Sequence, residues 1–301
     1  MRRLRHTLLA LALGLGALAG MAPAAEPLAA PAAVTAPAPR LLAGPDLYAQ
    51  VLPAIGFIRS EYDEATGTGT GWVVDRESRL MVTNHHVVHH LGRRANQIRV
   101  CFPVRDEQNE IIAEAAHYRR TVLKSGIKAR VVFTSPERDL ALLQLDRLPQ
   151  GTNALPLAAT SIRPGEAVAS VGNPARSEAC WVFNSGTVRQ IYRRTFRANK
   201  QNIAARMVET QQPIASGDSG SPMLNFKGEV VGVISSTKED APLFNYGIDL
   251  TELRAFLEQA GTGDQASAPD RTDSENSGRG DKYGSRPRSF SGIARAADGN
   301  D

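Results

Sequence analysis

The sequence predicts a central unit of antiparallel β-structure, closed into barrels or sandwiches. Between residues 45 and 260 the chain is a series of short segments rich in Val, Ile, Leu and Thr, such as RLMVTN (79–84), ARVVFT (129–134) and EAVASVGN (166–173). Gly, Pro, Asn and Asp separate these segments at close spacing, which is typical of strands joined by tight turns. Apolar residues make up 42% of the chain, which is enough to form a core.

The N-terminus predicts export. A basic start (Met1-Arg2-Arg3-Leu4-Arg5) precedes an apolar run at 8–19 and small residues that end at Ala24. This order is typical of a secretory signal peptide, here residues 1–24. A membrane anchor is the alternative, but the run is shorter than the about 20 residues that a spanning helix needs. We therefore expect a bacterial periplasmic or secreted protein with no stable membrane span in its mature form.

The segments that flank the central unit differ from it in composition. Residues 25–44 are rich in Ala and Pro and predict a flexible leader, whereas residues 261–301 have scarcely an aliphatic side chain before Ile293 and predict a disordered tail. Two segments predict short helices, 45–53 and 249–261. The second has an apolar face made of Leu250, Leu253, Phe256 and Leu257.

The net charge gives little reason to expect a nucleic-acid partner. It is +4, but loss of Arg2, Arg3 and Arg5 with the signal brings the chain close to neutrality. Two local basic clusters remain, and we expect solvated loops or hairpin tips at both, with steering of an acidic substrate as the alternative. Their members are Arg119, Arg120, Lys124, Lys128 and Arg130, and Arg189, Arg193, Arg194, Arg197 and Lys200. The only cysteines, Cys101 and Cys180, form a possible disulfide in an oxidising compartment.

The segment ASGDSGSP (215–222) predicts a nucleophilic serine at Ser219. A serine hydroxyl needs a base to remove its proton and donors placed where negative charge develops on the substrate oxygen. The glycines on both sides allow a tight turn in which the N–H groups of Gly217 and Ser219 point into one hollow, an oxyanion hole. A Gly-Ser surface turn is the alternative.

The base is expected in MVTNHHVVHH (81–90), where histidines follow an apolar strand directly. The pKa of histidine lies near working pH, so its ring can take up a proton and return it. A metal site among the four histidines is the alternative, but a helical zinc hydrolase would need a glutamate between the paired histidines, and there is none.

A third residue must orient the imidazole and offset the positive charge it acquires, which requires a buried carboxylate. Asp139 leads straight into the aliphatic strand LALLQL (140–145), where an unpaired carboxylate would be costly. A turn aspartate that caps the strand is the alternative.

Taken together, TNHHVV, DLALL and GDSGSP resemble, in order and surroundings, the motifs of the trypsin-like serine peptidases, in particular the bacterial HtrA-type branch. The resemblance covers roughly residues 46–258 and makes His86 the base, Asp139 the orienting carboxylate and Ser219 the nucleophile. It implies two six-stranded antiparallel barrels, at about 46–148 and 152–258, with the active site in the cleft between them, within a protease domain at 45–260.

The chain departs from the HtrA-type pattern in three respects. No PDZ domain is expected after residue 260. The interval from His86 to Asp139 is long, with residues 105–126 as an insertion. Asp218 matches the aspartate that pairs with a newly cut N-terminus in animal trypsin relatives, so activation by cleavage after Arg40 is a further hypothesis.

The expected function is endopeptidase, with polypeptide substrates and no metal or organic cofactor. The expected walls of the primary pocket carry no acidic residue where a preference for Arg or Lys would need one, so cleavage after small to medium uncharged residues is predicted. These wall residues are Pro213, Ile214, Ser216, Ser235 and Ser236. The alternative is a catalytically silent scaffold that binds partner proteins. The oligomeric state is left open.

Overall fold

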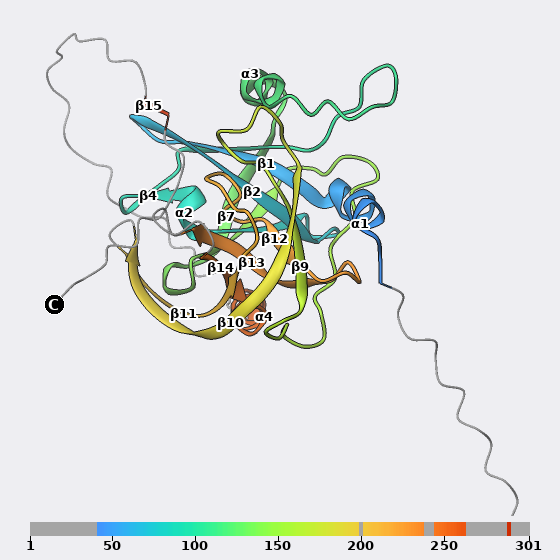
Figure 1. The fold of residues 1–301 in the computed structure, drawn as a ribbon. Coiled ribbons are helices and arrows are strands. Elements are labelled where there is room, and N and C mark those ends of the chain that lie inside the picture. The colour runs from blue at the N-terminus through green and yellow to red at the C-terminus, as the bar shows by residue number, and fades with distance from the viewer. Residues whose placement is uncertain (1–40, 199–200, 238–243, 263–287, 290–301) are drawn as a thin grey trace, which may run out of the picture. The chain divides into compact units, whose positions relative to one another are not determined.

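The computed structural model describes residues 41–198, 201–237, 244–262 and 288–289, and its strands form two barrels that follow one another along the chain (Figure 1). In the first barrel the hydrogen-bonded order is β1-β6-β7-β8-β3-β2, and pairing of β1 with β2 closes the ring. Its strands are β1 (Ile55–Glu61), β2 (Ala65–Asp75), β3 (Leu80–Thr83), β6 (Gln97–Cys101), β7 (Ile127–Ser135) and β8 (Leu140–Leu145).

The second barrel is closed in the order β10-β11-β14-β13-β12-β9, with antiparallel pairing throughout. Its strands are β9 (Ala167–Gly172), β10 (Val182–Ala198), β11 (Gln201–Thr210), β12 (Pro222–Leu224), β13 (Val230–Thr237) and β14 (Asn245–Asp249). The predicted architecture of two six-stranded antiparallel barrels is confirmed.

The apolar run of β8 is explained by burial on both of its faces. One face lines the first barrel, and the other is covered by α4 (Leu250–Thr262), which comes from the end of the second barrel. Phe256 of α4 packs against Phe133 of β7 with ring centroids 5.3 Å apart. Each fully buried Leu or Phe contributes about 1.5–3 kcal/mol to the free energy of unfolding. Because α4 follows the second barrel in the chain and packs on the first, this burial stabilises the contact between the two barrels.

The two helices expected from the sequence are present. α1 (Gly44–Val51) begins with Pro45 in its first turn, buries Leu47 and Val51, and runs into the short 3-10 helix η1 (Leu52–Ala54). In α4, Leu250, Leu253 and Phe256 of the predicted apolar face are buried, and Leu257 is half-buried against the core.

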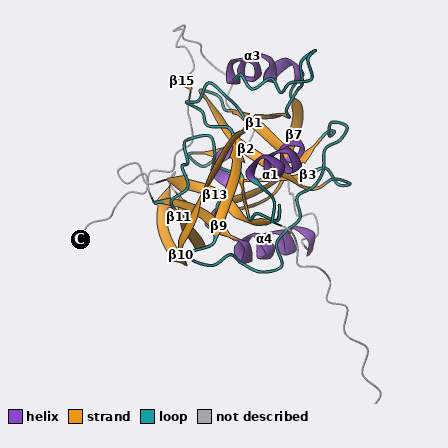
Figure 2. Ribbon diagram, turned by 45° about the vertical axis from the view of Figure 1, so that its right-hand side comes forward, coloured by secondary structure: helices purple, strands orange, loops and turns teal. Residues whose placement is uncertain are grey.

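The insertion at 105–126 folds into an element that the sequence reading did not identify. A bridge between Arg105 and Ile111 forms a small turn, and α3 (Ala115–Ser125) follows. Tyr118 of α3 is buried edge-on against Trp181, with centroids 4.5 Å apart. In both views α3 lies at the opposite end of the molecule from α4 (Figures 1 and 2).

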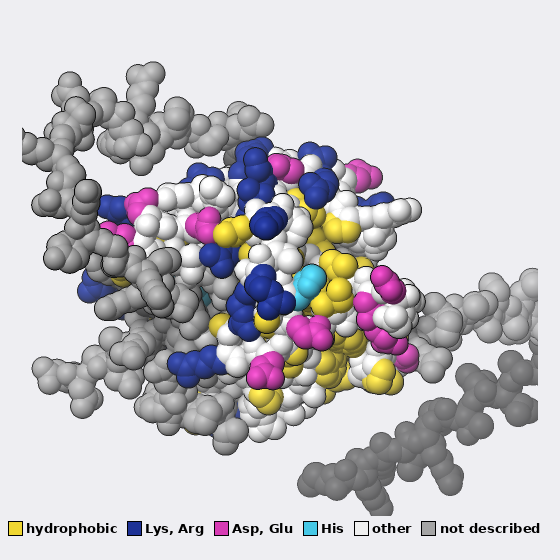
Figure 3. Space-filling view, turned by 90° about the horizontal axis from the view of Figure 1, so that it is seen from above, with side chains coloured by type: hydrophobic (Ala, Val, Ile, Leu, Met, Phe, Trp, Pro, Cys, Tyr) yellow, Lys and Arg dark blue, Asp and Glu magenta, His cyan; other side chains and the backbone are white. Residues whose placement is uncertain are grey.

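The first basic cluster therefore lies on a helix and a strand rather than in a loop, whereas the second lies on the β10–β11 hairpin, with Arg197 close to the end of β10 and Lys200 outside the described residues. Arg119, Arg120 and Lys124 lie on α3, whose face of the molecule displays many basic side chains (Figure 3). Lys128 and Arg130 lie on β7. The second cluster follows the long strand β10 from Arg189 to Arg197.

Four short elements complete the described chain. α2 (His85–Val88) and the hairpin of β4 (His89–His90) with β5 (Arg93–Arg94) follow β3, the 3-10 helix η2 (Pro136–Arg138) precedes β8, and β15 (Arg288–Ser289) pairs in parallel with the start of β2. None of the described helices is long and apolar enough to cross a membrane. The predicted signal peptide, the leader up to residue 40 and most of the predicted tail lie outside the described residues.

Candidate active site

His86 is held on a single helical turn at the edge of the first barrel. β3 ends at Thr83, and α2 begins two residues later, with Asn84 in extended conformation at its N-cap. The His86 side chain is buried, because α2 packs against β1, β2, β7 and β8. The His86 ring is thus held just after the end of a strand whose position is set by the barrel.

Asp139 faces this ring from the junction of η2 and β8. Its backbone is left-handed, with φ of 54°, so the chain reverses between the 3-10 helix and the strand. Both carboxylate oxygens lie 2.9 Å from Nδ1 of His86, and Oδ1 also accepts the backbone N–H of His86 at 3.1 Å. The N–H of His85 and the amide of Asn84 bind the carbonyl of Asp139, so the two backbone segments are joined as well.

The carboxylate of Asp139 is favoured in its charged form despite being buried. Burial by itself raises the pKa, but the nearby charge of His86 and hydrogen bonds from His86 and Ser235 outweigh it, and the pKa of Asp139 lies below its usual value. A charged carboxylate on Nδ1 fixes the imidazole tautomer that leaves Nε2 free to accept a proton.

Ser219 lies in a tight turn that the second barrel presents to the first. Both flanking glycines have positive φ, +96° at Gly217 and +88° at Gly220. A Cβ on Gly220 would lie 2.1 Å from the carbonyl oxygen of Thr70, so only glycine permits this approach of the two barrels. The backbone of Ser219 is bonded across the same boundary, since its carbonyl accepts the N–H of Thr70 at 2.9 Å.

Ser235 links the hydroxyl of Ser219 to the carboxylate of Asp139. The Oγ of Ser219 donates to the carbonyl of Ser235 at 3.0 Å, and the Oγ of Ser235 donates to Oδ2 of Asp139 at 2.8 Å. Nε2 of His86 is buried and has no hydrogen-bond partner among the described residues. Hydrogen bonds thus connect His86 to Asp139, Asp139 to Ser235 and Ser235 to Ser219, and the Ser219 hydroxyl donates to Ser235 rather than to the imidazole.

Thr70 and Asn173 hold the turn before Ser219, and the sequence reading did not identify either. The Oγ1 of Thr70 donates to the carbonyl of Gly217 at 2.9 Å and accepts the backbone N–H and side-chain amide of Asn173 at 3.0 and 3.1 Å. Thr70 belongs to GTGTG in β2, and Asn173 to VGNP after β9. Both motifs were visible in the sequence, but only the fold brings them together.

Two backbone amides at this turn are available to a ligand. Among the described residues, neither the N–H of Gly217 nor that of Ser219 donates to another protein group. A Cβ on Gly217 would lie 2.4 Å from the carbonyl oxygen of Asn173, so a side chain there would displace the turn. These are the donors that the sequence predicted for an oxyanion hole.

Asp218 is buried beneath the same turn with an incomplete set of partners. Its Oδ2 accepts the N–H of Ala215 at 2.9 Å, whereas Oδ1 has no partner within the described chain. Burial raises the pKa of Asp218 to about 7.

The hypothesis of activation by cleavage concerns the chain just before the described residues. Close to their start, the backbone N–H of Leu42 donates to the carbonyl of Phe226 at 2.7 Å. Arg40 lies outside the described residues, so activation by cleavage there stays a prediction.

His85, His89 and His90 lie on α2 and β4, next to His86 in the chain, and form no recognisable metal centre within the described residues. His85 and His89 stack with ring centroids 4.1 Å apart, and His90 lies 5.7 Å from the ring of Tyr62. Burial lowers the pKa of His85 and, to about 4, that of His89, which favours neutral rings. No group of three or more His, Cys, Asp or Glu side chains that could hold a metal ion occurs in the described ranges.

The two cysteines are free thiols in the structure, so the possible disulfide is absent from it. Burial raises the pKa of Cys101 to about 11 and that of Cys180 to about 12. A thiolate is the reactive form of cysteine, and these shifts disfavour it.

The predicted pocket residues lie beside the Ser219 turn with different exposures. Pro213 is exposed, Ile214 is half-buried, and Ser216 and Ser235 are buried. The Oγ of Ser216 has no hydrogen-bond partner in the described part of the chain. Ser236 is in β13, and its side chain lies outside the described set.

Comparisons with known proteins agree with the fold. A family model described as "Trypsin-like peptidase domain" matches residues 69–233. The chain is 28% identical over 225 residues to "Serine protease HTRA1A" of Danio rerio, covering 71% of this chain and 40% of that protein. It is 25% identical over 209 residues to "Putative serine protease HhoA" of a Synechocystis strain, covering 67% and 45% respectively. The chain thus spans less than half the length of these relatives.

Among solved structures, the chain resembles the active form of the Rv3671c protease from M. tuberculosis, with a TM-score of 0.58 and 21% identity over 73% of this chain and 86% of that one. It also resembles Deg5, with a TM-score of 0.51 and 22% identity over 71% of this chain and 91% of that one. At this level of identity, the two structures support the fold alone.

Proposed function

The chain belongs to the trypsin-like peptidase family, and we propose that it is a protease of the HtrA and Deg branch that hydrolyses peptide bonds through His86, Asp139 and Ser219. The observation that carries the proposal is the buried bond between Nδ1 of His86 and the Asp139 carboxylate, beside a nucleophile turn. A structural histidine would not need a charged carboxylate on one nitrogen and a buried, unpartnered second nitrogen.

In the proposed reaction, rotation of the Ser219 side chain takes its hydroxyl from the carbonyl of Ser235 to Nε2 of His86. His86 removes the proton as Ser219 Oγ attacks the substrate carbonyl, and it then gives that proton to the leaving amine. Asp139 holds the ring and stabilises its charged form. Water repeats the sequence on the acyl-enzyme, which restores Ser219. The side chains supply the proton transfers, and no cofactor is required.

The N–H groups of Gly217 and Ser219 would stabilise the oxyanion that forms at each stage. Loss of one such donor costs about 3 kcal/mol of transition-state stabilisation. The bond from Thr70 to the carbonyl of Gly217 supports this role, because it restrains the peptide unit between Gly217 and Asp218.

For specificity, we propose cleavage after small to medium uncharged residues. The observation in favour is that Pro213, Ile214, Ser216 and Ser235 are all uncharged and adjoin the nucleophile turn. A library of peptides that differ only at the residue before the scissile bond tests this. Preferred cleavage after Arg, Lys or Glu would contradict the proposal.

We also propose that the protein is exported. The basic, apolar and small segments of residues 1–24 support export. A relative from Pseudomonas putida, 27% identical over 57% of this chain, is described as a probable periplasmic serine endoprotease. Sequencing the N-terminus of protein recovered from the periplasm tests the predicted cut after Ala24, and also reveals whether a cut after Arg40 occurs.

A fluorophosphonate probe tests the central proposal, because it labels only a serine that a base has activated. We expect labelling and casein cleavage by the unaltered protein and by Ser221→Ala, whose buried hydroxyl has no hydrogen-bond partner among the described residues. Ser219→Ala and His86→Ala should do neither, while circular dichroism reports an intact fold. Absence of both activities from the folded, unaltered protein would favour the silent binding scaffold instead.

A further inference from the structure

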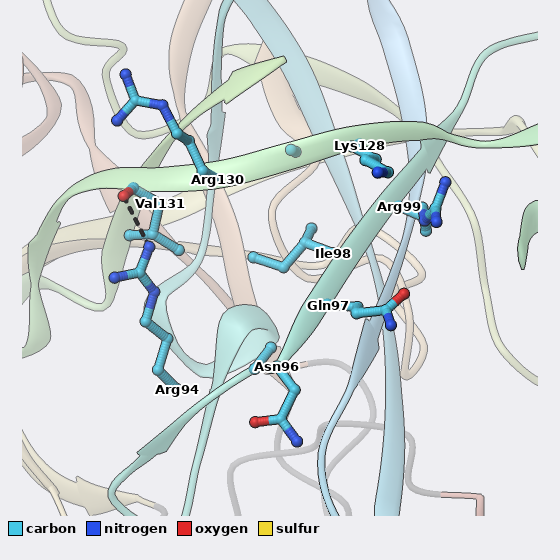
Figure 4. Close-up of a pocket in the computed structure, with 10 residues that line it drawn as sticks. Arg94, Asn96, Gln97, Ile98, Arg99, Lys128, Arg130 and Val131 are labelled. Carbon is cyan, nitrogen blue, oxygen red and sulfur yellow. Dashed lines mark hydrogen bonds between the residues drawn. The ribbon is translucent and has the colours of Figure 1, made fainter. Parts of the chain in front are cut away.

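A basic pocket lies on the first barrel where β6 and β7 separate. Residues 94–99 and 128–131 line a cavity of about 460 Å³. The two strands pair only from Ile98 to Val100 and from Ile127 to Ala129, so beyond this point their facing edges diverge. The guanidinium of Arg94 reaches across the gap and donates to the carbonyl of Val131 at 2.9 Å (Figure 4).

The pocket concentrates positive charge without an opposite charge. Its lining includes Arg94, Arg99, Lys128 and Arg130 and no Asp or Glu. None of these four forms an ion pair with any residue that the structure describes. Their bonded partners are neutral: Arg99 donates to the carbonyl of Gly126 at 3.2 Å, and Arg130 donates to the side chain of Gln144.

The strand register places basic residues directly opposite one another, which destabilises the sheet. Arg99 on β6 lies directly opposite Lys128 on β7, and directly opposite Arg59 on β1. Directly opposed residues of an antiparallel pair share a face of the sheet, and like charges there are destabilising. Arg59 is offset by Glu61, 3.2 Å away on its own strand, but Arg99 and Lys128 have no such carboxylate. An anionic ligand would relieve this repulsion.

We propose that the basic pocket binds an Asp- or Glu-rich segment of the polypeptide substrate, which rests on the endopeptidase function proposed above. Lys128 and Arg130 are two residues apart on β7 and exposed, so their side chains leave one face about 7 Å apart. Acidic residues at alternate positions of an extended peptide have the same repeat. This match favours a polypeptide over a polyphosphate or a nucleic acid.

The pocket is connected to the catalytic histidine by a short piece of chain. β4 and β5 follow α2 directly, Arg94 ends β5, and the N–H of Ala95 donates to the carbonyl of Val88, the last residue of α2, at 2.9 Å. A segment bound here is therefore held beside the element that carries His86. Binding energy from a remote part of the substrate increases kcat/KM when it helps to position the reacting bond.

Direct binding tests the proposal without requiring catalysis. The probe is a fluorescent peptide of alternating Glu and Ala, with alternating Gln and Ala as the neutral counterpart, measured by anisotropy on Ser219→Ala. We expect the acidic peptide to bind more tightly and its affinity to fall with salt. Lys128→Gln with Arg130→Gln should weaken it about fivefold or more, since two cation–carboxylate contacts are lost.

The matched control is Arg76→Gln with Arg147→Gln, which removes two exposed positive charges elsewhere. It should change the affinity less than twofold. In the active protein, an acidic extension of a peptide substrate should raise kcat/KM, and the Lys128/Arg130 variant should lose this gain while cleaving the unextended peptide normally.

Equal weakening by the two double variants, or equal binding of the two peptides, would overturn the proposal. Binding of inorganic polyphosphate through Lys128 and Arg130 without binding of the acidic peptide would also overturn it. If Ser219 fails to react with a fluorophosphonate but the acidic peptide still binds through these residues, the endopeptidase function is wrong and the acidic-segment site remains.

Discussion

The two barrels hold their parts of the proposed active site by different kinds of interaction. In the first, His86 and Asp139 are joined by short bonds to a charged carboxylate, and the backbones that carry them are also bonded to each other. In the second, the Ser219 turn is held by neutral hydrogen bonds, and Oδ1 of Asp218 lies buried without a described partner. The proposed acid–base pair is therefore preorganised, whereas the geometry of the proposed nucleophile depends on a turn that can rearrange more readily.

The largest expected loss of activity comes from removing the negative charge of Asp139, which orients the His86 ring in the first barrel. Asp139→Asn keeps the shape of the side chain but no longer favours the imidazole tautomer that accepts a proton at Nε2. We expect kcat to fall about 10⁴-fold with little change in KM. Steady-state kinetics on a peptide substrate measures this. The exposed Asp146→Asn serves as the control and should retain full activity.

If kcat of Asp139→Asn fell by less than about tenfold, the bond between Asp139 and His86 would not be what makes His86 a base. The contrast between the two barrels would then disappear. Proton NMR gives a second reading, since the proton on Nδ1 of His86 should resonate far downfield in the unaltered protein and shift in the variant.

The next effect concerns the oxyanion donors of the second barrel. Gly217→Ala would place a methyl group 2.4 Å from the carbonyl oxygen of Asn173 and 2.6 Å from the nitrogen of Ala175. The turn must shift, so we expect kcat to fall about 10²–10³-fold, the loss typical of one misplaced donor. Gly151→Ala is the control, because Gly151 also has a positive φ, +81°, but has nothing within 4 Å of the added methyl group. Comparable losses in both variants would point to backbone strain rather than to the turn.

A smaller effect is expected from the bond that joins the barrels. Thr70→Val keeps the β-branched shape but leaves the carbonyl of Gly217 and the amides of Asn173 without their hydroxyl partner. Unsatisfied buried groups cost about 1–3 kcal/mol, so we expect roughly a tenfold loss of kcat/KM and slower fluorophosphonate labelling. Thr68→Val, two residues away on β2, should have no such effect. A Thr70→Val enzyme with unchanged labelling would mean that the turn is fixed by other contacts.

The sequence was sufficient to propose those parts of the site that carry a local chemical pattern. Ser219 between glycines, a histidine after an apolar strand and Asp139 before an aliphatic one each carry a recognisable local pattern, and the family resemblance supplied the two-barrel fold. The apolar face of α4 could also be read from its spacing. α3 was not predicted, although Ala115, Tyr118 and Val122 have helical spacing, because residues 105–126 were considered only as an insertion between His86 and Asp139.

What could not be read from the sequence depends on contacts between distant residues. Thr70 and Gly217 are 147 residues apart, and Ser235 reaches Asp139 across 96. No spacing rule links such positions, since the closure of two barrels and the packing between them bring them together. The direction of the Ser219 hydroxyl is equally inaccessible, because it depends on which acceptor, the carbonyl of Ser235 or the ring of His86, lies in reach.

The smallest expected effect is on the pH dependence of the free energy of unfolding, through Asp218 in the nucleophile turn of the second barrel. Burial raises the pKa of Asp218 from 3.8 to about 7, so between about pH 4 and pH 7 the folded protein keeps a proton that the unfolded chain has lost. The stabilising contribution of the neutral carboxyl is complete below pH 4, declines as pH rises and is gone above pH 7. The free energy of unfolding should fall by up to about 1.4 kcal/mol per pH unit from this group. Asp218→Asn keeps a neutral side chain and should remove that slope, as measured by urea denaturation at pH 5, 6, 7 and 8. Asp146→Asn should keep the slope. An unchanged slope in Asp218→Asn would mean that the buried carboxyl is already charged and that the nucleophile turn is held as firmly as the pair of His86 and Asp139.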